Sequence, residues 1–301
     1  MKSEAILRTT AIQRFSVDDG PGIRTTVFCK GCNLHCVWCH NPETISKGAS
    51  LQFNAGMCIH CGMCVSACPS DAHAFEQEVH TIDRVRCKVC GACAQTCFSG
   101  ALKILGEERT VSEILGLVLR DKDFFDNTGG GVTFSGGEPM LQHEALRQAL
   151  ELCKDYGLHT AVDTAGNVPF SWFEEIMPFT DLFLYDLKCF SSSAHKRWTG
   201  VANELILQNI QKLGERGAKV FIRTPLIEGV NTDESEIESL ARFASALEGV
   251  QLYQLLPYHD YGAGKYETLG QETKSLKSPD EVKLQKITDV FLRYDIPVRL
   301  R

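Results

Sequence analysis

The sequence predicts an α/β protein, built as a partial, TIM-like (β/α)6 barrel that is interrupted by a cysteine-rich insert. Two observations predict this class. Apolar segments alternate with amphipathic ones along residues 106–301, which is typical of βαβ units with parallel strands. Eight of the 14 cysteines lie within residues 51–104, where long-range periodicity is lost. We therefore expect three segments: the start of the barrel at 1–48, the insert at 49–105 and the rest of the barrel at 106–301.

The elements of the barrel follow from apolar runs that end at turn residues. The first is a short buried strand at 25–28, directly before a cysteine-rich loop. Further strands are expected at 132–137, 159–166, 181–188, 219–226, 250–258 and 296–301. Helical periodicity fills the intervals, at 111–125, 141–157, 170–179, 202–217, 232–249 and 278–294. Six such units would leave the barrel incomplete, with its chemistry at the carboxyl ends of the strands.

Composition excludes several classes of protein. The chain has 301 residues and is 44% hydrophobic, enough to bury a large core. Its net charge of −7 does not suggest a nucleic-acid partner. No apolar run approaches the length of a membrane span, and the N-terminus lacks the apolar stretch of a secretory signal. We expect a cytoplasmic protein with no membrane partner.

The cysteines are clustered in a way that favours metal binding. Twelve of the 14 lie between residues 29 and 97, and only Cys153 and Cys189 follow. Disulfide scaffolds are small, secreted and spread along the fold, so disulfides are the less favoured interpretation.

Cys32, Cys36 and Cys39 form a C-x3-C-x2-C triplet on one loop. Three thiolates can hold three irons of a [4Fe–4S] cluster and leave the fourth iron open to a ligand such as S-adenosylmethionine (SAM). The alternative is a zinc site with His35 or His40 as fourth ligand, but zinc motifs favour two separated cysteine pairs. Cys29 ends an apolar strand, and we interpret it as a buried small hydrophobe.

Two further cysteine runs match the two-cluster ferredoxin pattern, in which the last cysteine of each run binds the other cluster. This spacing predicts a ferredoxin-like insert with two more [4Fe–4S] clusters, three in all. Phe98 replaces the proline that usually follows the second run. The clusters could carry electrons, support the structure or help to dock a partner. The predicted ligand sets are Cys58, Cys61, Cys64 and Cys97, and Cys68, Cys87, Cys90 and Cys93.

Residues 18–43, DDGPGIRTTVFCKGCNLHCVWCHNPE, resemble the signature of the glycyl-radical-enzyme activating enzymes. These are radical SAM oxidoreductases typified by pyruvate formate-lyase activase. The resemblance implies that SAM is reductively cleaved and that its adenosyl radical takes a hydrogen from a glycine of a partner glycyl radical enzyme. It also implies a monomer and an electron donor such as reduced flavodoxin or ferredoxin. Pyruvate formate-lyase activase lacks the insert, so a different glycyl radical enzyme is the expected partner.

The resemblance extends to the ends of the barrel strands. It implies that SAM contacts the residues beside the last cysteine of the triplet, the Gly-Gly-Glu turn, and polar residues at four later strand ends. A monovalent cation is expected at Asp163, Thr164 and Asp186. The buried-looking Arg24 needs a partner, which could be structural. The expected cofactor-binding residues are Trp38, Cys39, His40, Gly136, Gly137, Glu138, Asp163, Asp186, Leu187, Lys188, Arg223 and His259.

Two other functions fit parts of the sequence. A radical SAM enzyme could modify another peptide or a small molecule, although such enzymes often carry extra clusters in a C-terminal extension. An electron-transfer protein would need only the clusters. This function gives no role to an open iron at the triplet or to the Gly-Gly-Glu turn. Release of 5′-deoxyadenosine separates this second function from an enzyme.

Overall fold

The structure is a computed structural model that describes residues 4–301; residues 1–3 of the predicted first segment lie outside it. One nine-stranded sheet runs through these residues in the order β13-β12-β11-β10-β9-β8-β2-β1-β7. The neighbours from β2 to β13 pair in parallel, whereas β1 and β7 are antiparallel additions at one edge. The predicted parallel-sheet α/β core is therefore confirmed. The strands are β1 (Ile6–Ser16), β2 (Arg24–Cys29), β7 (Glu107–Thr110), β8 (Gly131–Gly136), β9 (Thr160–Thr164), β10 (Leu182–Asp186), β11 (Val220–Leu226), β12 (Val250–Pro257) and β13 (Val298–Leu300).

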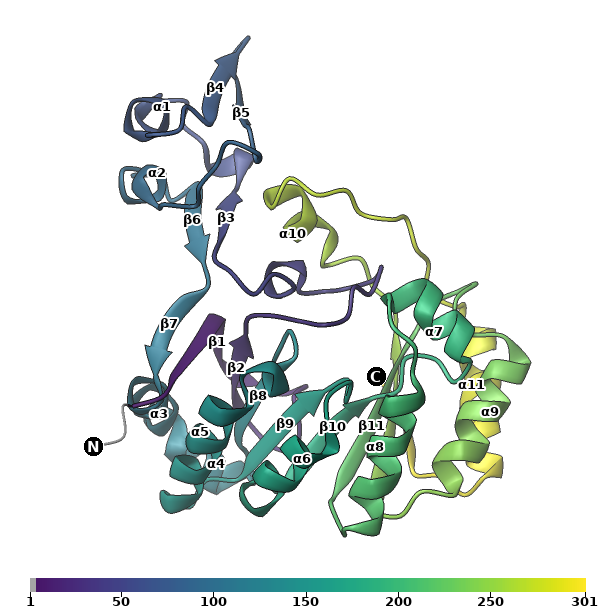
Figure 1. The fold of residues 1–301 in the computed structure, drawn as a ribbon. Coiled ribbons are helices and arrows are strands. Elements are labelled where there is room, and N and C mark those ends of the chain that lie inside the picture. Colours follow the sequence, from purple (N-terminus) through teal and green to yellow (C-terminus); the bar gives the residue numbers. More distant parts are fainter. Residues whose placement is uncertain (1–3) are drawn as a thin grey trace.

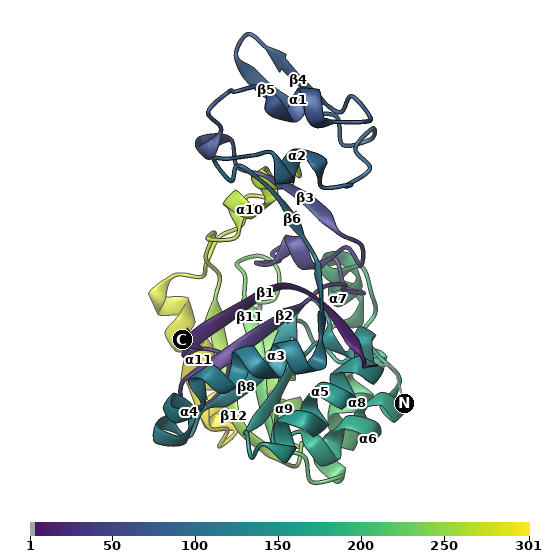
Figure 2. The ribbon, with the colours of Figure 1, turned by 90° about the vertical axis from the view of Figure 1, so that its left-hand side faces the viewer.

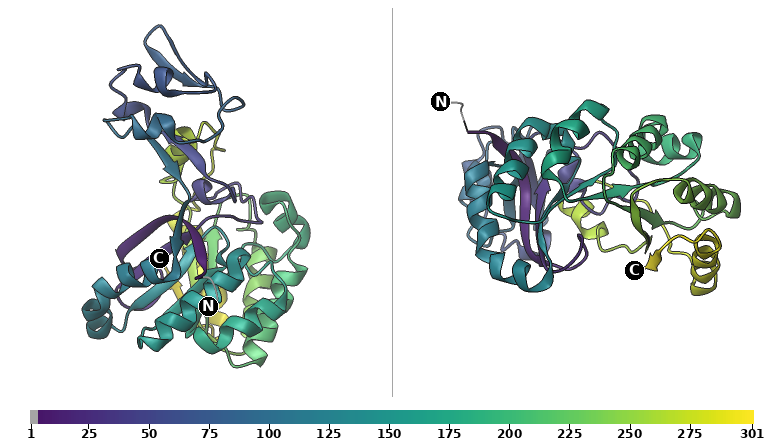
Figure 3. Two further views of the ribbon diagram at one scale, coloured as in Figure 1. Left: turned by 60° about the vertical axis from the view of Figure 1, so that its left-hand side comes forward. Right: turned by 90° about the horizontal axis from the view of Figure 1, so that it is seen from below.

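Except for α10, which lies beside the insert, the helices of the barrel lie along the outer face of the curved sheet (Figures 1 and 3). The longer helices bury an apolar stripe at helical spacing, such as Leu146 and Leu150 of α5 or Ile210 and Leu213 of α8. Burial of each such side chain contributes about 1.5–3 kcal/mol. The helices are α3 (Val111–Val118), α4 (Lys122–Thr128), α5 (His143–Asp155), α6 (Phe170–Ile176), α7 (Ser192–Thr199), α8 (Glu204–Glu215), α9 (Glu234–Ser245), α10 (Ala263–Thr268) and α11 (Glu281–Arg293). No helix within residues 4–301 combines the length and apolar character that crossing a bilayer requires.

The cysteine-rich insert projects from the barrel as a separate lobe (Figures 1 and 2). Its stem is the antiparallel pair of β3 (Ser50–Phe53) and β6 (Leu102–Leu105). Beyond the stem lie α1 (Met63–Ala67), α2 (Ala92–Gln95) and a hairpin of β4 (His73–Glu76) and β5 (Val79–Ile82). The lobe has its own small core, centred on Leu51, Cys64, Cys93 and Leu102. The insert also contacts α10, because Arg84 Nη2 donates to the Thr268 carbonyl at 3.2 Å.

The structure differs from the sequence prediction in two ways: β1, β7, α7 and α10 were not expected, and one expected helix is divided. The segment 111–125 is not continuous: α3 ends at Val118, a 3-10 turn spans Leu119–Asp121, and α4 follows. The carboxylate of Asp121 is fully buried there and accepts from Arg14 Nε at 3.0 Å and Thr25 Oγ1 at 2.6 Å. A charged group can be buried only with such partners, so the turn is fixed by contacts with strands distant in sequence.

Candidate active site

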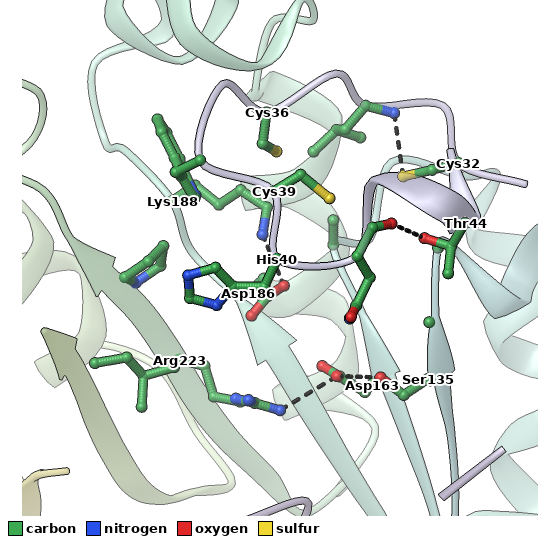
Figure 4. Close-up of a pocket in the computed structure, with 18 of the residues that line it drawn as sticks. Cys32, Cys36, Cys39, His40, Thr44, Ser135, Asp163, Asp186, Lys188 and Arg223 are labelled. Carbon is green, nitrogen blue, oxygen red and sulfur yellow. Dashed lines mark hydrogen bonds and ion pairs between the residues drawn. The ribbon is translucent and has the colours of Figure 1, made fainter. Parts of the chain in front are cut away.

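A cavity of about 430 Å³ opens at the carboxyl ends of the parallel strands. Its wall combines the loop that follows β2 with residues at the ends of β8, β9, β10, β11 and β12 (Figure 4). This volume is in the range of small-molecule sites, and the position is where folds of this class place their chemistry. The cavity lies at the rim where the sequence predicts the site.

The cysteine triplet forms one side of the cavity. Cys32, Cys36 and Cys39 all line it, and none is in a disulfide. The loop is held from behind by α7, because His35 N–H donates to the Thr199 carbonyl at 2.7 Å and Val37 N–H donates to the Trp198 carbonyl at 3.1 Å. These backbone hydrogen bonds therefore hold the loop so that all three thiols face the same cavity.

Burial keeps these three thiols protonated when no metal is bound. Burial raises the pKa of Cys32 and Cys36 to about 12, and that of Cys39 to about 11. Because the thiolate is the form that binds metal, the protons must leave as a metal enters. Cys29, in contrast, is fully buried in the main core, as the sequence predicts.

The Gly136-Gly137 turn at the end of β8 packs against this loop. Gly137 N–H donates to the Cys29 carbonyl at 2.9 Å, and Glu138 N–H donates to the Gly31 carbonyl at 2.7 Å. A Cβ on Gly137 would lie 2.3 Å from the Gly31 oxygen, and Gly136 has a φ of +108°. The glycines are needed because two backbone segments approach closely, and both still line the cavity.

Two acid–base pairs occupy the floor of the cavity. Asp163 Oδ2 accepts from Ser135 Oγ at 2.6 Å and pairs with Arg223 Nη1 at 3.2 Å, while Lys188 Nζ pairs with Asp186 Oδ2 at 2.8 Å. Burial raises the pKa of Asp163 to about 6, against the opposing effect of Arg223. For Lys188, burial lowers the pKa, but the carboxylate of Asp186 outweighs it and the net shift is upward. The floor therefore presents both signs of charge.

Aromatic rings form the remaining wall. His40 and His259 are stacked with ring centroids 4.1 Å apart, and Tyr258 lies beside His40 at 5.9 Å. His40 Nε2 also lies 2.9 Å from the His259 carbonyl, which ties the cysteine loop to the end of β12. Trp38 lines the cavity and packs on Ile227. Flat rings of this kind can stack on a purine.

Comparisons with known proteins agree with this geometry. The model of the radical SAM superfamily matches residues 26–244. The choline trimethylamine-lyase activating enzyme of Oleidesulfovibrio alaskensis is 38% identical, with 95% of each chain covered. The trans-4-hydroxy-L-proline dehydratase activating enzyme of Clostridioides difficile is 39% identical, covering 93% of this chain and 94% of its own. The chain belongs to the glycyl-radical-enzyme activating enzymes of the radical SAM superfamily.

Two further comparisons support the family. The isethionate sulfite-lyase activating enzyme of Desulfovibrio desulfuricans is 41% identical over 92% of this chain and 90% of its own. A solved domain of a pyruvate-formate lyase-activating enzyme from Bacteroides vulgatus is 36% identical with a TM-score of 0.51, covering 57% of this chain and 99% of that domain. Members of this family are radical SAM oxidoreductases that generate glycyl radicals, as the resemblance in the sequence implied.

Two residues of this activating enzyme lie outside the cavity where direct contacts were expected. Glu138 is fully buried behind the wall and accepts from Thr164 Oγ1 at 2.8 Å and from the Ala165 N–H at 2.9 Å. Leu187, the residue that follows β10, is buried in the main core. Glu138 and Leu187 thus support the site and do not line it.

The residues expected to hold a cation are each engaged by other protein groups. Asp163 and Asp186 pair with the two bases, and the Thr164 hydroxyl donates to Glu138. Asp163 Oδ1 and Arg223 Nε are buried, and no hydrogen-bond partner for either is found among residues 4–301. A buried polar atom without a partner costs about 1–3 kcal/mol, which favours a polar ligand at this floor.

The insert brings its eight cysteines together in two groups, each around its own hollow. One hollow is lined by Cys58, Cys61, Cys64 and Cys97. The other is lined by Cys68, Cys87, Cys90 and Cys93. Each group takes its fourth thiol from the other run, which is the grouping that the spacing predicts.

Sequence reasoning missed several residues of the site. Asp18, Tyr258 and Arg301 line the cavity, and Arg301 Nη2 pairs with Asp18 Oδ1 at 3.2 Å. Tyr258 could have been found, because it directly precedes His259 at a strand end. Arg24 is fully buried and donates to Thr133 Oγ1 and the Val132 carbonyl, both at 2.6 Å, so its partners are structural.

Proposed function

We propose that the triplet Cys32, Cys36 and Cys39 holds a [4Fe–4S] cluster whose fourth iron stays open for SAM, and that the cavity is the site of SAM cleavage. A cluster held by these thiols would supply the electron for reductive cleavage of SAM, and the adenosyl group would then take a Cα hydrogen from a glycine of the partner. The observation that carries this proposal is that three unbonded thiols share one cavity with two acid–base pairs.

The charges of the floor support a zwitterionic ligand. The guanidinium of Arg223 suits the carboxylate of the methionine moiety, and the free Oδ1 of Asp163 suits its ammonium group. The backbone of Gly136 and Gly137 lies between the floor and the cysteine loop. The rings of His40, Tyr258 and His259 would face the adenine, as would Trp38.

We infer that the insert is a ferredoxin-like domain at about residues 49–105 that holds two further [4Fe–4S] clusters, which makes three in the chain. This inference is supported by the lining of the two hollows, because each contains three cysteines of one run and the last cysteine of the other. These clusters would pass electrons from reduced flavodoxin or ferredoxin toward the cavity. A monovalent cation at Asp163, Thr164 and Asp186 remains a prediction, as do the monomeric state and the cytoplasmic location.

The partner is expected to be a glycyl radical enzyme of the kind that the relatives activate. Choline trimethylamine-lyase, trans-4-hydroxy-L-proline dehydratase and isethionate sulfite-lyase are the first to test, since their activating enzymes match this chain over nearly its whole length. The test incubates anaerobically reconstituted, reduced protein with SAM and each partner. We expect 5′-deoxyadenosine in every case, and a glycyl doublet in the electron paramagnetic resonance (EPR) spectrum with the correct partner.

The matched controls are cysteine-to-alanine changes. Cys36→Ala should abolish 5′-deoxyadenosine formation, whereas Cys153→Ala, in the core of α5, should leave it unchanged. Formation of 5′-deoxyadenosine by Cys36→Ala would contradict the cluster assignment. Modification of a residue other than glycine would favour a different radical SAM function.

A further inference from the structure

Two buried histidines of the insert have no role in the chemistry at the barrel. His73 begins β4 and His80 lies in β5 of the same hairpin, with relative exposures of 5% and 8%. His80 lines the hollow of Cys58, Cys61, Cys64 and Cys97, and His73 lines the other hollow. The pair therefore lies between the two groups of thiols.

The contacts of His80 are specific. Its Nδ1 lies 3.7 Å from Cys58 Sγ, and its Nε2 lies 3.6 Å from Cys64 Sγ and 2.9 Å from His73 Nδ1. Phe75 stacks on the ring with centroids 4.7 Å apart, and Phe53 packs edge-on at 4.4 Å. The imidazole is thus held between two aromatic rings, with Nδ1 facing one thiol and Nε2 facing a second histidine and, at a longer distance, a second thiol.

A mononuclear metal site at Cys64, His73 and His80 would use the same atoms. Two imidazole nitrogens on one tetrahedral zinc, at about 2.05 Å each, lie about 3.3 Å apart. The observed 2.9 Å between the two nitrogens is a hydrogen-bond distance. Cys64 also belongs to the four thiols of its hollow. The histidines therefore act on those thiols and do not form a separate metal site.

The contacts of His80 indicate which of its two ring nitrogens carries the hydrogen. A sulfur bound to iron only accepts hydrogen bonds, and Cys58 Sγ is the partner that faces Nδ1, so a bare Nδ1 would set two acceptors against each other. A hydrogen on Nδ1 avoids this and leaves Nε2, whose shortest contact is His73 Nδ1 at 2.9 Å, free to accept. Nε2 is then the acceptor, and it receives a hydrogen bond from His73 Nδ1. His73 thereby fixes the tautomer of His80, as second partners commonly do for histidines near metal sites.

We propose that His80 donates its Nδ1–H to Cys58 Sγ and raises the reduction potential of the cluster held by Cys58, Cys61, Cys64 and Cys97, with His73 as a positioning residue. The inference rests on the proposed function, since it requires that cluster. A hydrogen bond to a ligand sulfur stabilises the reduced, more negative state of an iron–sulfur cluster, so its potential rises.

The second group of thiols provides an internal comparison. Ser70 Oγ lies 3.6 Å from Cys68 Sγ, and Ser99 Oγ lies 3.6 Å from Cys97 Sγ, so these two contacts match. For Cys87, the contact found among residues 4–301 is the Val89 N–H at 3.4 Å, and no imidazole hydrogen bond reaches it. His80 therefore makes the two clusters unequal, and the cluster at Cys58 accepts an electron more readily.

The test measures the midpoint potentials of the reconstituted full chain by EPR-monitored titration. His80→Phe keeps the aromatic packing and removes the donor. At a fixed potential, we expect at least a tenfold fall in the ratio of reduced to oxidised cluster, which is about 59 mV for one electron. One cluster should shift and the other two should not. His73→Phe should shift the same cluster by less, and His143→Phe, at the start of α5 and outside the insert, should shift none.

Unchanged potentials in His80→Phe at full iron content would overturn the inference and leave the proposed function intact. Absence of clusters from the wild-type insert would instead refute the proposed function. If His80→Phe loses iron, its potentials cannot be compared. The reduced wild-type protein, labelled with [15N]histidine, is then examined by pulsed EPR. Coupling of an imidazole nitrogen to a cluster supports the hydrogen bond, and its absence refutes it.

Discussion

The packing of the Gly137 turn against the cysteine loop predicts a large effect of adding one methyl group. In Gly137→Ala the new Cβ would lie 2.3 Å from the Gly31 oxygen and 2.9 Å from the Thr44 oxygen, and both are backbone atoms. Relief of this overlap costs about 1–3 kcal/mol. Separation of the two segments also weakens the bonds from Gly137 N–H to Cys29 and from Glu138 N–H to Gly31, each worth about 0.5–1.5 kcal/mol. The free energy of unfolding should fall by about 2–6 kcal/mol.

The assay is anaerobic denaturant unfolding, followed by tryptophan fluorescence, together with the iron content of the reconstituted protein. Gly116→Ala is the matched control, because this helical glycine has no atom within 4 Å of an added Cβ. It should be neutral or stabilising by up to about 1 kcal/mol. Gly137→Ala should also lose iron, since the loop that carries Cys32 moves. Wild-type stability and iron content in Gly137→Ala would refute the reasoning.

Three further predictions concern charge and anchoring. Burial raises the pKa of Glu138 to about 7, so its contribution to stability is full below about pH 4.5 and is lost as the pH rises through 7. Glu138→Gln should remove about 2.5 kcal/mol of this pH dependence, measured as the difference in unfolding free energy between pH 5 and pH 8. An unchanged difference would contradict the burial of the carboxylate. Arg223→Met leaves Asp163 buried without its positively charged partner, which typically lowers the free energy of unfolding by about 3–5 kcal/mol. The variant should also bind SAM more weakly in equilibrium dialysis. Wild-type affinity would exclude Arg223 from the ligand site. Arg84→Ala removes the donors to the Leu51 and Thr268 carbonyls. Amide hydrogen exchange in α10 should therefore become faster, while exchange in α8 stays unchanged. If α10 exchanges at the same rate in the variant and the wild type, the insert is not anchored there.

The features that could be predicted from the sequence are those whose chemistry is local. Cysteine spacing predicts the triplet and both four-cysteine groups of the insert, because ligands on one loop lie within a few residues of each other. Alternation of apolar and amphipathic runs gives the parallel strands from β2 to β13, but not the antiparallel β1 and β7. The acid–base residues at strand ends were also found, because parallel strands end at one rim.

The features that were missed depend on partners distant in sequence. The break before α4 requires Arg14, which lies 107 residues from Asp121. The direction of the Glu138 side chain depends on Thr164 and Ala165, so the turn alone could not show that it points away from the cavity. The support of the cysteine loop by α7 is a backbone contact and leaves no mark in the sequence.

The most direct test of the central claim uses SAM labelled with 15N in its amino group. The reduced protein is frozen with this SAM and examined by pulsed EPR. If an iron beside Cys32, Cys36 and Cys39 is open to SAM, the labelled nitrogen couples to the cluster, and the coupling disappears in Cys36→Ala. A reduced triplet cluster that shows no coupling to the bound label would contradict the account.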